Sequence, residues 1–380
     1  LGIKIRLLKN TCEITGNGLN GFNYKKNIVL NAGNSGTLAR LIMGLLVHSK
    51  KEMKIIGDNS LSKRDFFRIT KPLKLFGAKF KTNSGKLPIK IRGTNHPKAI
   101  KYIETKGSAQ IKSSIILAAL NSEGTTFIKA KRSRNHTELL LKYLRLSIST
   151  TKQKNYDLIE INGKRNIKPF NYKIPSDISS AAFFMVLTTL SKNSKLKIKD
   201  VNLNPSRMGI VKILKMMGVK IKIQNPKIYK NEKIGDIIIK STKNIKPINC
   251  PIELNSSAID EFLLIFLVAA KAKGVSKFKK LSELNQKESP RLFLGSKILK
   301  KIGIKTLVTS DSIKIFGNPN LKIDKKIKIE KFLKDHRIFM TSVIAALVLG
   351  GNWEIHDKNC YKTSFPSFLK NIKNLGAKFT

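Results

Sequence analysis

The chain of 380 residues has only three cysteines, Cys12, Cys250 and Cys360, and they lie far apart. This spacing fits neither a structural zinc site nor a disulfide framework. Sparse cysteine of this kind indicates a reducing compartment, so we expect a cytoplasmic protein whose thiols are buried or idle. A catalytic cysteine is not expected.

The sequence also lacks any long hydrophobic run. Its longest apolar stretches, residues 262–270 and 343–349, have the length of core helices and fall short of the ~20 residues that span a bilayer. We therefore expect no membrane partner. No signal or transit peptide is recognisable at Leu1, where the chain opens in the pattern of a strand already under way.

Acidic residues are scarce, with 24 Asp and Glu against 74 Lys and Arg and a formal net charge of +50. Such a charge is typical of nucleic-acid-binding proteins. Here, however, 62 of the basic residues are lysines spread along the whole chain, and they alternate with Ile in segments such as 195–199 and 326–329. This alternation is typical of strands with one solvated face. We therefore expect no nucleic-acid partner, but a field that attracts a small anionic substrate.

Two kinds of helix alternate along the chain. The first kind is rich in small apolar residues and begins near Ser35, Ser108, Asp177, Ile259 and Asp335. The second is amphipathic and ends before a glycine that suits a left-handed C-terminal position. These glycines are Gly77, Gly218, Gly303 and Gly376, and a weaker copy without glycine spans residues 136–146.

Helix, strand, helix and strands therefore form a unit that recurs five times, at intervals of roughly 70–80 residues. Six units would give two lobes of three. We expect a first lobe at residues 1–174, lacking its N-terminal unit, and a second lobe at 175–380, divided at the polar segment that precedes Asp177.

Anion binding is expected at the N-termini of the first-kind helices, where free N–H groups and the positive end of the helix dipole meet. Seven of the 12 arginines lie in or beside these motif-like segments. In a chain that uses lysine by default, arginine indicates a need for two-point binding of carboxylate or phosphate. These seven are Arg40, Arg64, Arg68, Arg134, Arg207, Arg291 and Arg337, of which Arg40, Arg68 and Arg207 also fit plain helix-surface ion pairs.

Segments in this order resemble the motifs of the enolpyruvyl transferases that act on shikimate 3-phosphate. They are residues 33–41 (GNSGTLARL), 57–64 (GDNSLSKR), 107–113 (GSAQIKS), 133–138 (SRNHTE), 177–184 (DISSAAFF), 204–209 (NPSRMG), 259–261 (IDE), 287–291 (KESPR), 335–337 (DHR) and 363–366 (TSFP). The resemblance covers nearly the whole chain. It implies an α/β fold of two lobes, an inside-out α/β barrel of repeated βαβαββ units, with five of six units visible.

The resemblance also implies the reaction. A hydroxyl of shikimate 3-phosphate adds to C2 of phosphoenolpyruvate while C3 gains a proton, and phosphate then leaves the tetrahedral intermediate. Two acid–base groups and several cations are needed for this chemistry, but no metal or cofactor. The expected partners are the two anionic substrates alone, and a monomer is expected.

Site residues follow from the same resemblance. Asp260 is expected to be the base near the attacking hydroxyl and Glu288 to transfer the proton at C3. The residues implied for phosphoenolpyruvate are Gly36, Arg64, Lys287, Arg291 and Arg337. The residues implied for shikimate 3-phosphate are Ser108, Ala109 (through its backbone), Gln110, Arg134, Asp260 and Lys287. Purely structural roles stay open: a helix cap for Asp260, a first-turn position for Glu288, and structural roles for His136 and His336.

Several positions depart from the family pattern. Its N-terminal Lys-Ser motif is absent from residues 1–380, so this chain taken alone is expected to be inactive or impaired. Asp65 and Phe66 follow Arg64 where Pro-Met is usual, and Asn135 replaces an Asp. Pro290 replaces another Asp, and with Ser289 it fits a helix N-cap and first turn.

Three other functions remain open at this stage. The transferase that acts on UDP-N-acetylglucosamine shares fold and co-substrate, but it carries a loop cysteine that residues 81–107 lack. An RNA-binding protein related to RNA-phosphate cyclases would suit the charge, yet no motif of aromatic and basic residues appears. A protein that only binds ligand is the third, because of the missing Lys-Ser motif.

Overall fold

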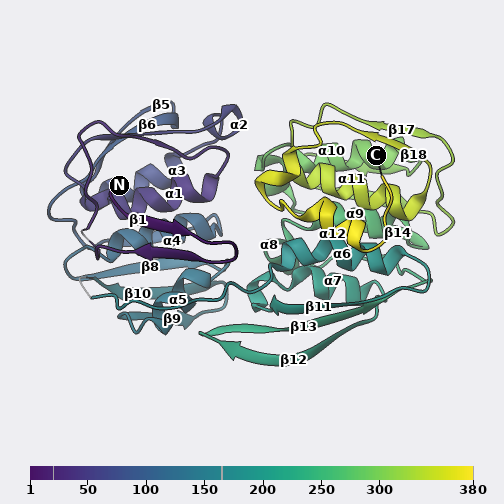
Figure 1. The fold of residues 1–380 in the computed structure, drawn as a ribbon, viewed down its shortest axis with the longest axis horizontal. Coiled ribbons are helices and arrows are strands. Elements are labelled where there is room, and N and C mark those ends of the chain that lie inside the picture. The colour runs from purple at the N-terminus through teal and green to yellow at the C-terminus, as the bar shows by residue number, and fades with distance from the viewer. Residues whose placement is uncertain (20, 164–165, 380) are drawn as a thin grey trace. The chain divides into compact units, whose positions relative to one another are not determined.

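The computed structural model describes residues 1–19, 21–163 and 166–379, and the chain divides into two compact units, Leu1–Lys173 and Ile174–Thr380. Each unit has its own hydrophobic core. Figure 1 shows the chain coloured from its N-terminus to its C-terminus, and each unit can be followed there as a layered arrangement of helices and sheets.

The first unit contains two copies of one βαβαββ topology. The first copy is β3 (Val29–Asn31), α1 (Gly36–Leu45), β4 (Met53–Ile56), α3 (Phe67–Leu75), β5 (Lys79–Asn83) and β6 (Lys86–Arg92). The second copy is β7 (Lys101–Glu104), α4 (Ala109–Ala119), β8 (Thr125–Lys131), α5 (His136–Tyr143), β9 (Ile148–Lys152) and β10 (Tyr156–Asn162). The sheet orders, β3-β4-β6-β5 and β7-β8-β10-β9, are equivalent, with a parallel first pair and antiparallel partners after it.

The second unit repeats this topology with shorter first strands. The third copy is α6 (Ile178–Leu190), β11 (Lys195–Asn202), α7 (Gly209–Met216), β12 (Ile221–Tyr229) and β13 (Glu232–Lys240). The fourth is α9 (Phe262–Ala270), β14 (Gly274–Phe278), α10 (Arg291–Lys301), β15 (Thr306–Val308) and β16 (Ile313–Gly317). Parallel bridges from Ser176 to Val201 and from Asn249 to Lys277 stand where the first strand of each copy would pair.

The fifth copy, also in the second unit, consists of β17 (Lys326–Ile329), α11 (His336–Leu349), β18 (Asn352–Ile355) and α12 (Phe368–Asn374), with β17 parallel to β18. The hairpin β1 (Lys4–Leu7) and β2 (Cys12–Thr15) precedes the first copy. Between the elements named above lie the short helices α2 (Asn59–Ser62) and α8 (Asn255–Ala258) and 3-10 turns at Leu46–His48, Pro205–Arg207, Ile252–Leu254, Ser282–Gln286 and Cys360–Thr363. The predicted unit is thus confirmed in the first four copies, and the fifth has its two helices and the strand between them but no strand after α12 in the described residues.

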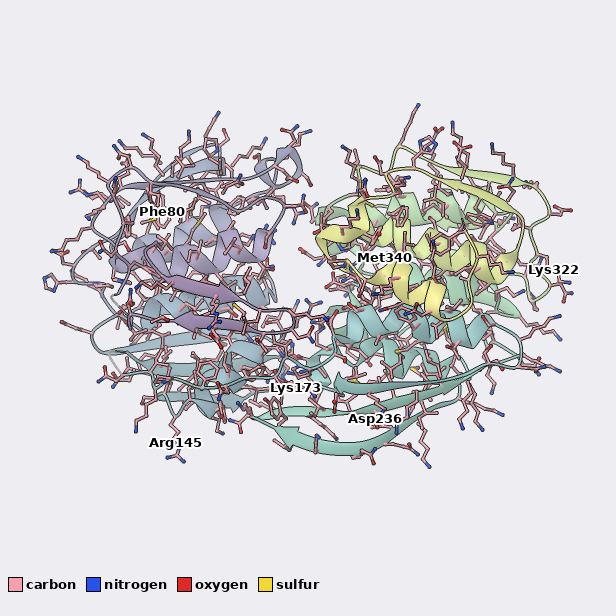
Figure 2. The ribbon with its side chains drawn as sticks, viewed as in Figure 1. Phe80, Arg145, Lys173, Asp236, Lys322 and Met340 are labelled. Carbon is pink, nitrogen blue, oxygen red and sulfur yellow. The ribbon has the colours of Figure 1, made fainter. Side chains whose placement is uncertain are left out.

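Helices fill the interior of each unit and sheets cover it (Figure 1). Every residue of α9 is buried, whereas the residues of β6 alternate between exposed and buried. This explains the lysine–isoleucine alternation, because Ile packs on the helices and Lys faces water. In Figure 2, Met340 lies among the helices and Lys322 projects outward. Within the described residues no helix is long and apolar enough to cross a membrane, since even α11 has only 14 residues.

The helix ends largely follow the sequence signals. Ser35, Ser108, Asp177 and Asp335 are N-caps whose side chains accept backbone N–H groups, as the first-kind pattern indicates. Ile259 is an exception, because α9 begins only at Phe262. The four predicted C-terminal glycines all have positive φ, between +85° and +102°. The amphipathic helix without a glycine, α5, is followed by Arg145, which has a φ of +58° and takes the place of the glycine.

Candidate functional site

Two arginines converge on the first turn of α1. Ser35 caps this helix by accepting the N–H of Leu38 at 3.1 Å. A Cβ on Gly36 would lie 3.1 Å from Nη1 of Arg40 and 3.2 Å from Nη1 of Arg64. The missing side chain therefore leaves room for two guanidinium groups beside a helix N-terminus, an arrangement that favours a phosphate or carboxylate.

Arg64 is brought to α1 by the short helix α2. Asp58 caps α2 by accepting the N–H of Leu61 at 2.7 Å, and its other oxygen accepts Nδ2 of Asn34 at 2.6 Å. The unusual Asp65 turns away, since its carboxylate accepts the N–H of Phe67 at 2.7 Å and lies 3.8 Å from Nε of Arg68. The charge of Asp65 is thus engaged by the first turn of α3.

Gln110 links this cluster to α4. Its Oε1 accepts Nη1 of Arg40 at 2.5 Å, and its Nε2 donates to Oγ1 of Thr37 at 2.8 Å. Ser108 caps α4 through the N–H of Ile111 at 3.4 Å, and Ala109 is the first residue of the helix. The three adjacent residues expected for shikimate 3-phosphate therefore stand at a second helix N-terminus, joined by hydrogen bonds to the first.

Arg134 precedes α5, which packs beside α4. Oγ of Ser113 and Oγ1 of Thr137 are hydrogen-bonded at 2.7 Å, and Nζ of Lys112 lies 2.6 Å from Oε1 of Glu138. These contacts join α4 to the first turn of α5. The segment that carries Arg134 is therefore tied to the segment that carries Ser108.

In the second unit, Arg291 is the centre of a charged cluster, and its side chain is only 2% exposed. Its Nε and Nη2 donate to the two oxygens of Asp335 at 2.9 and 3.2 Å, and Nη2 also donates to Oε2 of Glu288 at 2.5 Å. Nη1 lies 3.7 Å from Oδ1 of Asp260. Both predicted acid–base residues are thus held by one guanidinium.

Lys287 and Arg337 complete this cluster. Nζ of Lys287 lies 3.2 Å from Oδ1 of Asp260, and Nη1 of Arg337 donates to the backbone oxygen of Asp260 at 2.9 Å. The backbone N–H of Arg337 is capped by Asp335 at 2.9 Å. The structure therefore brings together all five site residues predicted from this half of the sequence.

The structural alternatives for the two carboxylates are wrong. The N-cap residue of α9 is Glu261 and not Asp260, and Glu288 lies before α10, which begins at Arg291. The expected N-cap role of Ser289 is also wrong, because Pro290 holds that position and the Ser289 hydroxyl donates to Asp335 at 2.7 Å. Asp335 draws this hydroxyl inward because it is fully buried and needs several donors.

Burial and the arginines shift the pKa values in this cluster. Burial raises the pKa of Asp335, but Arg291 outweighs that effect and holds it at about 2. Burial lowers the pKa of His336 to about 4, helped by the charge of Arg337. His336 is therefore neutral at pH 7, whereas Asp335 is ionised and keeps Arg291 charged.

A second group of charged residues lies around Glu261, the neighbour of Asp260 in the chain. The buried Glu261 accepts the hydroxyl of Ser179, and Nη2 of Arg207 donates to that same hydroxyl at 2.5 Å and to Asp177 at 3.1 Å. Burial, and then the neighbouring Asp260, raise the pKa of Glu261. The ion pair expected for Arg207 is thus present, and so is that of Arg68, whereas Arg40 contacts Gln110 and the first turn of α1 instead.

Arg40, Asp335 and Glu261 have no predicted role in the site, although the structure places them against residues that do. For Arg40 the retention of arginine in a lysine-rich chain was the available signal. No such signal exists for a buried carboxylate, because its partners come from distant segments. In the described part of the chain, no group of three or more His, Cys, Asp or Glu could hold a metal ion.

Comparison with known proteins first defines the class. The structure superposes on the enolpyruvyl transferase NikO from Streptomyces tendae with a TM-score of 0.70 at 13% identity, covering 89% of this chain and 76% of that one. At this identity the likeness concerns the fold alone. The repeated βαβαββ architecture is therefore that of the enolpyruvyl transferases, as predicted.

More similar proteins define the family. The family model of EPSP synthase (3-phosphoshikimate 1-carboxyvinyltransferase) matches residues 1–372. The EPSP synthase of Acinetobacter baumannii superposes with a TM-score of 0.84 at 36% identity, over 98% of this chain and 84% of that one. The 3-phosphoshikimate 1-carboxyvinyltransferase of Vesicomyosocius okutanii is 40% identical over 378 residues, which are 99% of this chain and 85% of the relative. The chain belongs to the EPSP synthase family.

Proposed function

We propose that this protein transfers the enolpyruvyl group of phosphoenolpyruvate to the 5-hydroxyl of shikimate 3-phosphate and releases phosphate. Membership of the family supports this reaction over transfer to UDP-N-acetylglucosamine or binding of RNA. The observation that carries it is the cluster in which Arg291 holds Asp260 and Glu288. A synthase of this kind belongs to the shikimate pathway and to the biosynthesis of aromatic amino acids.

In this proposal Asp260 takes the proton of the attacking hydroxyl as its oxygen adds to C2 of phosphoenolpyruvate. Glu288 delivers a proton to C3 of phosphoenolpyruvate and removes one from C3 when the C2–O bond to phosphate breaks, so that the enol double bond is restored. The proton taken by Asp260 passes to the leaving phosphate, which departs as hydrogen phosphate. Arg291 keeps the two carboxylates at fixed positions, 3.7 and 2.5 Å from its nitrogens. Holding acid–base groups in place in this way contributes part of the rate enhancement.

The cations hold the anionic substrates. Arg64, Lys287, Arg291 and Arg337, with the space beside Gly36, bind phosphoenolpyruvate. Ser108, the backbone of Ala109, Gln110 and Arg134 bind shikimate 3-phosphate, together with Asp260 and Lys287. Neither substrate changes oxidation state overall, so the reaction as written balances without a redox cofactor.

The remaining expectations belong to the same proposal: a monomeric, cytoplasmic protein with no nucleic-acid partner. Idle thiols are consistent with a reducing compartment. Burial raises the pKa values of Cys250 and Cys360 to about 12, so both stay protonated at neutral pH, while Cys12 is exposed.

The experiment is a phosphate-release assay on the protein produced from its complete gene. We expect release only when phosphoenolpyruvate and shikimate 3-phosphate are both present. Release with UDP-N-acetylglucosamine in place of shikimate 3-phosphate would replace the proposal by its nearest rival. Tight RNA binding, with no phosphate release in the presence of either acceptor, would rule out enolpyruvyl transfer.

The roles of the two carboxylates are tested by Asp260→Asn and Glu288→Gln. Each variant should lower kcat by roughly 10²–10⁴-fold, the usual contribution of one acid–base group. Glu330→Gln is the matched control, because Glu330 pairs with Lys328 outside the cluster. Equal kcat for all three variants would contradict the assignment.

A further inference from the structure

Three charged side chains are buried together in the second copy of the first unit. Glu104 ends β7 and is 1% exposed, Lys112 lies in α4 and is fully buried, and Glu138 lies in α5 and is 5% exposed. We call them the Glu104–Lys112–Glu138 group. Burial of three charges is costly unless each has partners, and none of the three has a role in the proposed reaction.

Glu104 holds the loop that leads to Ser108. Its Oε1 accepts the N–H of Lys106 and its Oε2 that of Gly107, both at 2.8 Å. Gly107 has a φ of +67°, which only glycine adopts readily. Two successive N–H groups therefore fix the direction in which the chain enters α4.

Lys112 lies one turn after Ser108, and its N–H donates to the Ser108 oxygen at 3.1 Å. Its ammonium lies 2.6 Å from Oε1 of Glu138 and also stabilises the ionised form of Glu104. Burial raises the pKa of Glu104, and the loop N–H groups and Lys112 oppose that rise. The ammonium of Lys112 thus pairs with Glu138, and its charge also lowers the pKa of Glu104.

Glu138 carries the connection to Arg134. It belongs to the first turn of α5, and the segment just before that turn contains Arg134. The hydrogen bond between Ser113 and Thr137 runs alongside the ion pair. The group therefore connects the N-terminal part of α4 to the first turn of α5, which the Arg134 segment precedes.

We propose that Glu104, Lys112 and Glu138 are positioning residues for the shikimate 3-phosphate half-site. They fix the Ser108 hydroxyl, the N–H groups of the first turn of α4 and the Arg134 side chain relative to one another before the ligand binds. The proposal rests on the proposed function, because it takes these groups as the ligands of the substrate phosphate. Stability alone does not account for the charges, because well-packed apolar residues in place of a buried ion pair are often neutral or stabilising.

The test measures the KM for shikimate 3-phosphate and its dissociation constant in the absence of phosphoenolpyruvate. Lys112→Met should raise both by roughly ten-fold or more, the effect of losing one well-placed contact. The KM for phosphoenolpyruvate at saturating shikimate 3-phosphate should change by less than about two-fold, within the variation of independent sites. Lys112→Arg, which keeps the charge, should lie between the wild type and Lys112→Met.

Two further variants separate positioning from folding. Ile159→Ala creates a cavity at β10, in the sheet that also contains β7 and Glu104. It should lower the unfolding midpoint without changing the KM for shikimate 3-phosphate. The double variant Lys112→Met/Glu138→Leu replaces the pair by apolar side chains and should fold even if Lys112→Met does not. Its KM for shikimate 3-phosphate should remain raised, because Glu104 still lacks its counter-charge.

A wild-type KM in the double variant would overturn the proposal, because packing alone would then position the half-site. Parallel changes in Ile159→Ala and Lys112→Met would also overturn it. A wild-type protein that neither binds nor turns over shikimate 3-phosphate would instead refute the proposed function. The two failures are therefore distinct.

Discussion

At the scale of single residues, Arg291 shows why this lysine-rich chain retains arginine. Its planar fork donates to both oxygens of Asp335 and still reaches Glu288 and Asp260 with the remaining nitrogens. The compact ammonium of a lysine could not contact three carboxylates from separate segments in this way. Arg291→Lys should therefore misplace both proposed acid–base groups and is not a conservative change.

Gly36→Ala tests the space beside Arg40 and Arg64. The added methyl would lie 3.1 and 3.2 Å from their Nη1 atoms, so the guanidinium groups must shift by a few tenths of an ångström. We expect the KM for phosphoenolpyruvate to rise roughly ten-fold, equivalent to about 1.4 kcal/mol of lost binding. The unfolding midpoint should hardly change, because alanine favours helices.

Gly16→Ala is the control for that variant, since a Cβ there would meet nothing within 4 Å. It should leave steady-state kinetics unchanged. If Gly36→Ala behaves like Gly16→Ala, the first turn of α1 does not face phosphoenolpyruvate.

His336 makes stability depend on pH. Its folded pKa of about 4 lies below the ordinary 6.5, so the unfolded chain binds a proton first and stability falls as pH drops from 6.5 to 4. Between pH 7 and pH 5 this one residue should cost the wild type about 2 kcal/mol. Urea unfolding of His336→Gln should show a correspondingly smaller loss over the same interval. Identical losses in both proteins would show that His336 is charged, or unperturbed, in the folded state.

At the scale of elements, the glycines that end the amphipathic helices allow a clean test. Gly218 has a φ of +86°, and the nearest atom to an added Cβ would be the Asn244 oxygen at an ordinary 3.5 Å. Any cost of Gly218→Ala therefore comes from the backbone conformation. We expect about 1–2 kcal/mol of destabilisation by urea unfolding.

Gly218→Asn should cost less than Gly218→Ala, because asparagine tolerates the left-handed region better. We expect the same order at Arg145, with Arg145→Asn more stable than Arg145→Ala, because Arg145 also lies in that region with a φ of +58°. Alanine and asparagine variants of equal stability would contradict this explanation.

The same elements show what the sequence could predict. Caps and periodicity are local, so the positions of Ser35, Ser108, Asp177 and Asp335 at helix starts were predictable. The start of α9 was not, because Ile259, Asp260 and Glu261 continue from the short helix α8 without a capping side chain in the described structure. Local patterns do not reveal such a junction.

The candidate site likewise contains some residues that the sequence could predict and others that it could not. Motif resemblance identified the residues that should touch substrate. Within the second unit the structure brings together Asp260, Glu288, Lys287, Arg291 and Arg337. The charge of Lys112 could not be explained from its own segment, since its partner Glu138 lies 26 positions later in another helix. Long-range ion pairs of this kind follow from the topology of the sheet and not from a local pattern.

At the scale of the whole molecule, one topology repeated along the chain places lysine on the outer face of nearly every sheet. Strands β6 and β17 both alternate exposed lysine with buried isoleucine. The formal charge of +50 is therefore distributed over outer surfaces and is not confined to a groove that reads a polyanion. This distribution favours attraction of small anions.

Salt should act on this charge in two opposite directions. Screening weakens repulsion among the lysines, so the unfolding midpoint should rise between about 20 and about 200 mM NaCl. The same screening weakens attraction of phosphorylated substrates, so kcat/KM for shikimate 3-phosphate should fall over that range. Lys81→Glu/Lys227→Glu/Lys314→Glu, at exposed positions of β5, β12 and β16, lowers the formal charge by six and should reduce both responses. Responses of the same sign, or a triple variant identical to the wild type, would show that local contacts and not the overall field govern stability and substrate capture.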